Sequence, residues 1–101
     1  MRAMVLHEFS SPLQLGEVPD PKPGLDEVVV KVRACAPDML DVKTRAGQSN
    51  ITLPRIIGHE IAGEIAEVGA SVKNIRLGER VVVYDYLNCG ACEFCWKGRE
   101  T

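Results

Sequence analysis

Short apolar runs, broken by proline and glycine, fill the first third of the chain. Runs at 3–7 and 13–18 flank a turn signal at 10–12, and both are typical of short strands. Three prolines within 19–23 predict an extended connection, because proline cannot donate a hydrogen bond to a strand ladder. Residues 27–35 (EVVVKVRAC) give the strongest strand prediction, since they are rich in β-branched side chains and then alternate.

The pattern changes at Pro37. Residues 37–45 predict a short helix with proline in its first turn, and Gly47 is placed to stop it. A polar, irregular stretch follows, and two further apolar runs, 61–68 and 80–86, predict two more strands. Many short strands with glycine and proline at their ends favour a mainly β chain with short helices, folded as a small, partly open β-barrel.

Composition narrows the class of protein. A chain of 101 residues, 46% hydrophobic and 26% charged, predicts one globular domain. The balance of 12 basic and 14 acidic residues, without a basic run, argues against nucleic acid as a partner. No apolar stretch approaches the roughly 20 residues of a membrane helix, and the N-terminal apolar run is too short for a signal peptide. We therefore expect a cytoplasmic protein.

Three cysteines at Cys89-x-x-Cys92-x-x-Cys95 give the sharpest chemical signal. Thiolates at this spacing can converge on one tetrahedral zinc ion, but a structural zinc site needs four ligands. The fourth is Cys35, an outside group or a cysteine beyond the end of the chain. A redox pair and inert thiols are the competing interpretations. An iron–sulfur cluster is disfavoured because arginine occupies the position that a ferredoxin-type cysteine would take.

A second motif carries a family resemblance. The segment Gly58-His59-Glu60-x-x-Gly63-x5-Gly69-x-x-Val72 resembles the signature of the zinc-containing medium-chain dehydrogenase/reductase family, the zinc alcohol dehydrogenases. The stretches 23–34 and 77–81 are similar to that family's strand before the catalytic lobe and its approach to the zinc loop. The three cysteines match three of its four, the fourth falling two positions beyond Thr101.

The resemblance implies the architecture of a longer enzyme. Residues 1–101 would be the N-terminal part of a GroES-like catalytic domain, ending inside the structural zinc lobe at 88–101. A Rossmann domain binding NAD or NADP would follow, since residues 1–101 hold no Gly-x-Gly-x-x-Gly. The substrate would be a small alcohol, polyol or sugar, or the matching carbonyl compound. The full-length protein would be a dimer or tetramer, and this fragment alone would be inactive.

The same resemblance names a catalytic zinc site. The family's first zinc ligand is a cysteine, and its position falls on Asp38; certain sugar dehydrogenases of the family carry Asp there. Asp38, His59 and Glu60 would hold the zinc, and Asp41 would accept a hydrogen bond from His59. Cys35, three residues before Asp38, is the alternative ligand.

Leu40 departs from the family's motif. It occupies the position of a hydroxyl that accepts the alcohol proton, and leucine has neither donor nor acceptor. Either another group moves this proton, or the reaction is not simple alcohol oxidation. A zinc-stabilised β-barrel that binds a partner without catalysis is the alternative function.

Overall fold

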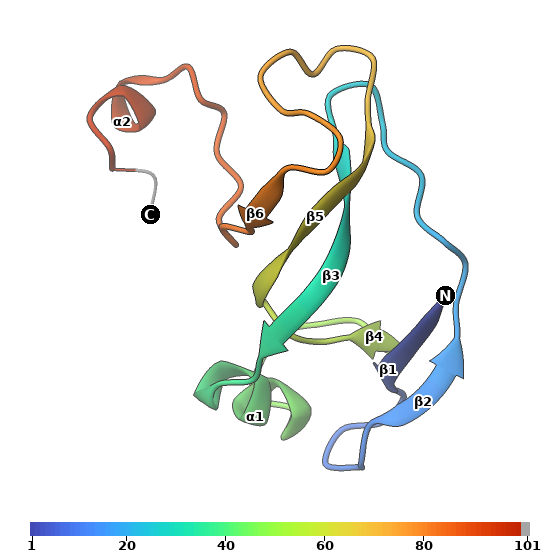
Figure 1. The fold of residues 1–101 in the computed structure, drawn as a ribbon. Coiled ribbons are helices and arrows are strands. Elements are labelled where there is room, and N and C mark those ends of the chain that lie inside the picture. The colour runs from blue at the N-terminus through green and yellow to red at the C-terminus, as the bar shows by residue number, and fades with distance from the viewer. Residues whose placement is uncertain (100–101) are drawn as a thin grey trace.

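Two three-stranded antiparallel sheets form the body of the chain (Figure 1). This is a computed structural model, and it describes residues 1–99. The first sheet has the order β2-β1-β4 and the second the order β3-β5-β6. The strands are β1 (Arg2–Leu6), β2 (Gln14–Glu17), β3 (Val28–Ala36), β4 (Arg55–Ile56), β5 (Glu60–Val68) and β6 (Arg80–Val82), and the helices are α1 (Met39–Arg45) and α2 (Glu93–Trp96).

The pairing of β3 with β5 is the longest ladder and dictates the shape of the second sheet. It runs from Val28 opposite Val68 to Ala36 opposite Glu60, with two register shifts. The strands approach closely at Gly63, where an added Cβ would lie 2.5 Å from the carbonyl oxygen of Lys31. A side chain at this position would therefore force the two strands apart.

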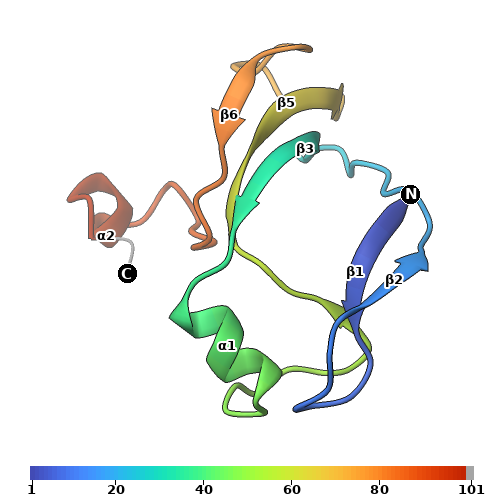
Figure 2. The ribbon, with the colours of Figure 1, turned by 60° about the horizontal axis from the view of Figure 1, so that its bottom comes forward.

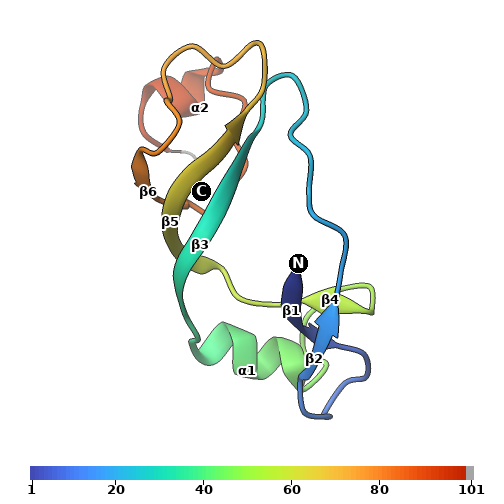
Figure 3. The same ribbon diagram turned by 45° about the vertical axis from the view of Figure 1, so that its right-hand side comes forward.

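Helix α1 follows directly on the end of β3 (Figures 2 and 3). The segment that carries α2 extends away from β6 on the other side. Neither helix within residues 1–99 has the length and apolar content needed to cross a bilayer. Residues 100 and 101, the end of the expected zinc lobe, lie outside the described residues.

The core is small. Val5, Leu6 and Ile65 are the buried apolar residues of the described chain, and Leu6 is fully buried. The radius of gyration is 15.5 Å, whereas a compact domain of this length has about 13 Å. The chain is thus less compact than a typical domain of its length, and the expectation of a mainly β fold with short helices is confirmed.

Two expected boundaries are corrected, and two short elements are added. The strand predicted at 80–86 ends at Val82, although the Val83 amide still donates to the Ile61 carbonyl of β5 just beyond it. The helix begins at Met39, so Pro37 lies before it rather than in its first turn. The two-residue strand β4 and helix α2, inside the cysteine loop, were not expected from the sequence.

We expect Leu6→Ala to lower the free energy of unfolding by about 2–5 kcal/mol, because it opens a cavity in a core with few other members. Leu87→Ala is the matched control, since Leu87 is fully exposed and its truncation should change stability by less than about 0.5 kcal/mol. Urea denaturation followed by circular dichroism measures both. Equal effects of the two substitutions would contradict this description of the core.

Candidate metal centres

Asp38 caps helix α1. Its backbone is extended, with φ −129° and ψ −170°, and its Oδ1 accepts hydrogen bonds from the Leu40 amide at 2.7 Å and the Asp41 amide at 3.2 Å. Capping by an aspartate satisfies amides that the first turn of a helix leaves without partners. This cap explains why the helix begins after Asp38 and not at Pro37. It also leaves Oδ2 of Asp38 free for another partner.

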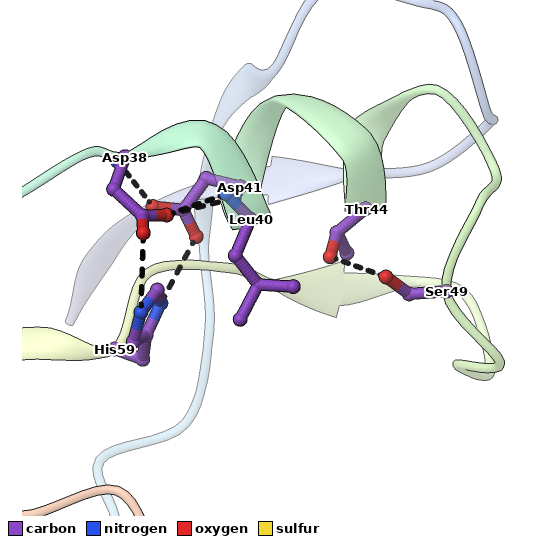
Figure 4. A network of polar contacts seen from close by, with 6 residues as sticks. All are labelled: Asp38, Leu40, Asp41, Thr44, Ser49 and His59. Carbon is purple, nitrogen blue, oxygen red and sulfur yellow. Dashed lines mark hydrogen bonds and ion pairs between the residues drawn. The ribbon is translucent and has the colours of Figure 1, made fainter.

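That free oxygen faces His59. Oδ2 of Asp38 lies 3.8 Å from Nε2 of His59, and Nδ1 of the same ring lies 3.5 Å from Oδ1 of Asp41 (Figure 4). Asp41 is itself held in place, because its Oδ2 accepts the Asp38 amide at 3.0 Å to complete a capping box. Asp41 is buried, so its carboxylate has few competing contacts with water.

Each nitrogen of the His59 imidazole therefore faces a different aspartate: Nδ1 faces Asp41 and Nε2 faces Asp38. A carboxylate beside Nδ1 favours the tautomer with its proton on that nitrogen, which leaves the lone pair of Nε2 directed toward Asp38. A metal ligand requires such a lone pair. The expected hydrogen bond from His59 to Asp41 stays a prediction, which the distance of 3.5 Å between Nδ1 and Oδ1 supports.

Glu60 completes the cluster. His59 directly precedes β5, and Glu60 is the first residue of that strand. One ligand atom each from Asp38, His59 and Glu60 lies within 4.8 Å of the others. Ligand atoms around a tetrahedral zinc at about 2.1 Å are themselves about 3.4 Å apart. The donor set and its spacing thus fit a zinc ion with small side-chain adjustments.

Cys35 lies outside this cluster. Its sulfur is next to Gly58, where an added Cβ would come within 2.8 Å of Sγ. Gly58 has φ +112°, a conformation that favours glycine, and it turns the chain into His59. Within residues 1–99, the geometry therefore favours Asp38 over Cys35 as the ligand.

Two residues of α1 lie near the cluster along the helix, Leu40 in its first turn and Thr44 one turn further along. Leu40 occupies the first turn between Asp38 and Asp41 and is about half exposed. One turn further along, the hydroxyls of Thr44 and Ser49 are 2.8 Å apart, a contact that ties the helix to the following loop. No signal in the sequence had pointed to this pair.

The three cysteines of the loop also converge. Sγ of Cys95 lies 3.8 Å from that of Cys89 and 3.5 Å from that of Cys92. Sulfurs around a tetrahedral zinc at about 2.3 Å are themselves about 3.8 Å apart, so the spacing fits three of the four ligands of a structural zinc site. Cys92 precedes α2 as its N-terminal cap residue and Cys95 lies within it, so this short helix helps bring the thiols together. Cys35 is not part of the group.

The thiols of this loop differ in acidity when no metal is bound. A hydrogen bond from the Ala91 backbone, followed by one from the Cys92 thiol, lowers the pKa of Cys89 from 9.0 to about 7. The neighbouring Cys92 thiol raises the pKa of Cys95 above 9.0. The thiolate is the reactive form of cysteine, and Cys89 reaches it at a lower pH than Cys95.

We expect alkylation of the metal-free chain by iodoacetamide to begin at Cys89. The modification rate should rise with pH, reach half its maximum near pH 7 at Cys89, and reach it only above pH 9 at Cys95. Peptide mass mapping after short exposures at several pH values measures both rates. Equal rates at the two cysteines near pH 7 would contradict the described geometry of the loop.

Comparison with known proteins decides the family. Residues 24–101 match the model of the alcohol dehydrogenase GroES-like domain. The chain belongs to this family. The GroES-like fold that the resemblance implied is therefore confirmed.

Similar proteins extend the comparison. A NAD-dependent alcohol dehydrogenase of Sulfolobus acidocaldarius is 36% identical over 99% of this chain and 31% of its own length. An acryloyl-coenzyme A reductase of Sulfurisphaera tokodaii is 39% identical over 99% of this chain and 30% of its own. A cobalt- and zinc-bound thermostable alcohol dehydrogenase from Pyrobaculum aerophilum has a TM-score of 0.86 at 37% identity, over 99% of this chain and 31% of that one. The chain thus spans less than a third of the length of these proteins.

Proposed function

We propose that this GroES-like domain is the N-terminal part of a zinc-dependent oxidoreductase that uses NAD or NADP on the CH–OH group of an alcohol, polyol or sugar. The observation that supports this most is the convergence of Asp38, His59 and Glu60 within 4.8 Å, in a chain of this family. The relatives that are named alcohol dehydrogenases support the same reaction class.

Each residue of the proposed site has a defined role. Bound zinc would supply Lewis-acid chemistry, polarising a carbonyl or stabilising an alkoxide. Asp38 would hold the ion through Oδ2 while Oδ1 stays on the amides of α1, which fixes the direction of the ligand. His59 would bind through Nε2, with its ring oriented by Asp41. Two carboxylates, Asp38 and Glu60, would offset the double positive charge of the ion.

The remaining proposals concern the whole protein. A Rossmann domain outside this chain would bind the nicotinamide cofactor, and a fourth cysteine outside it would complete structural zinc at Cys89, Cys92 and Cys95. The domain alone would not transfer hydride. We propose a cytoplasmic homo-oligomer, a dimer or tetramer, whose partners are its small-molecule substrates and not nucleic acid or membrane.

Leu40 favours a second candidate, the reduction of a carbon–carbon double bond conjugated to a thioester. In that reaction hydride adds to the β-carbon and a proton adds to the α-carbon, so no alcohol proton has to leave through a hydroxyl at position 40. Two similar proteins are named acryloyl-coenzyme A reductases, which is consistent with this candidate.

Assays of the zinc-loaded, full-length protein separate these functions. We expect NADH or NADPH to form with secondary alcohols or polyols, and turnover to stop when a chelator removes the metal. Oxidation of NADPH or NADH by acryloyl-coenzyme A, without alcohol turnover, would favour the second candidate. Turnover with neither substrate class would contradict both and leave a non-catalytic zinc-stabilised barrel.

A further inference from the structure

A cleft of about 480 Å³ opens beside the Asp38–His59–Glu60 cluster, on the second sheet. His59 and Glu60 lie in its wall, and Asp85 is the one other polar residue among the described residues that line it. Small aliphatic side chains provide the rest of the wall: Ala34, Ala36, Ile61, Ala62, Val82 and Val83. A ligand in this cleft meets the metal cluster, an apolar surface and a single additional carboxylate.

The chain stays beside β5 just past the end of β6, and this path leads Asp85 to the cleft. Ala62 is opposite Val82, and the Val83 amide donates to the Ile61 carbonyl at 2.8 Å just beyond the end of β6. Asp85 follows two residues later and lines the same cleft as His59 and Glu60. A small molecule held at the cluster therefore shares this cleft with the Asp85 carboxylate.

Asp85 is free to bind such a molecule. It is exposed, and within residues 1–99 no cationic group forms an ion pair with it. Glu64 on the same sheet differs, because its carboxylate accepts a hydrogen bond from Arg33 at 2.9 Å. An unpaired carboxylate accepts strong hydrogen bonds from hydroxyl and ammonium groups, whereas an aliphatic substituent has no donor for it.

We propose that Asp85 is a specificity-determining residue that selects alcohols with a second hydrogen-bond donor next to the reacting carbon. This inference rests on the proposed oxidation of CH–OH groups. The reacting hydroxyl lies at the metal cluster, and the neighbouring hydroxyl or ammonium group donates to the Asp85 carboxylate. Vicinal diols and amino alcohols are therefore preferred over simple alcohols of the same size.

A matched series of three secondary alcohols tests the preference: isopropanol, propylene glycol and isopropanolamine. They share one carbon skeleton and differ only in a methyl hydrogen, a hydroxyl or an ammonium group. In the zinc-loaded, full-length protein we expect kcat/KM for the two substrates with a second donor to exceed that for isopropanol by about 10- to 100-fold, the range for a hydrogen bond to a charged group.

Two substitutions test whether Asp85 causes the preference for substrates with a second donor. Asp85→Leu should remove this preference, so that kcat/KM for the two substrates with a second donor falls to about that for isopropanol in the same variant. Asp85→Asn keeps an acceptor of the same size without the charge, so it should retain turnover of propylene glycol better than that of isopropanolamine. Asp26→Leu, at an exposed aspartate outside the cleft, is the control and should change neither ratio.

Failure of this inference is distinguishable from failure of the proposed function. Turnover of all three alcohols with an unchanged ratio in Asp85→Leu overturns the role of Asp85 and leaves the proposed function intact. If none of the three alcohols is oxidised, the proposed function fails. Calorimetric titration of isopropanolamine into the zinc-loaded protein then tests the role of Asp85 on its own. Binding weakened about 10-fold or more in Asp85→Leu supports the site, and unchanged binding overturns it.

Discussion

Asp38→Ala in the full-length protein is expected to empty the catalytic metal site and lower kcat/KM by at least about 10³-fold. The substitution removes the oxygen that faces His59, and metal catalysis of this kind contributes several kcal/mol of transition-state stabilisation. Zinc content should fall by one ion per chain, while the ion at Cys89, Cys92 and Cys95 stays. Elemental analysis together with steady-state kinetics measures both effects.

Asp38 is proposed to bind the metal and it also caps α1, so controls must separate loss of the metal from loss of the helix cap. Asp38→Asn retains a good helix cap but loses the charge of the ligand, so it should keep α1 and weaken the metal. Asp38→Cys should hold zinc through a thiolate and lose the cap, at about 1 kcal/mol of stability. Cys35→Ser should leave the zinc content unchanged. Loss of one zinc from Cys35→Ser, with both retained in Asp38→Ala, would contradict the assignment.

Leu40→Ser is expected to raise the rate of alcohol oxidation by about 10²-fold in the full-length protein. The new hydroxyl would lie in the first turn of α1, next to Asp38, and could accept the proton that leucine cannot. A positioned group that transfers a proton accelerates such reactions about 10²- to 10⁴-fold. Initial rates with isopropanol at several pH values measure the change.

Val42→Ser is the matched control for this substitution, because it adds the same hydroxyl to an exposed position two residues further along α1. It should leave the rate unchanged within about twofold. A change of less than about threefold in Leu40→Ser would indicate that another group already carries the proton. A rate increase of equal size in both variants would contradict the role of position 40.

The sequence was most informative where ligand spacing is short and local. The three cysteines lie within seven residues, so any compact loop brings them together. The identity of Asp38 as a helix cap was harder to predict, because Pro37 is equally compatible with the first position of a helix. The extended backbone of Asp38 and its bonds to two amides decide this, and they also leave one oxygen free toward His59.

Features that depend on long-range pairing were not accessible from the sequence. The run at 80–86 has the composition of a strand throughout, but the paired strand ends at Val82. Asp85 had no visible role in the sequence, because only the fold brings it into the same cleft as His59, 26 positions earlier in the numbering. The proximity of Cys35 to Gly58 likewise depends on the path of β3 beside β5.

The most direct test of the proposed site is an anomalous difference map from crystals of the zinc-loaded, full-length protein, collected at the zinc absorption edge. We predict one peak about 2.0–2.2 Å from Oδ2 of Asp38 and Nε2 of His59, next to Glu60, and a second peak about 2.3 Å from the sulfurs of Cys89, Cys92 and Cys95. A first peak bonded to Cys35, with Asp38 bound only to the amides of α1, would contradict the account.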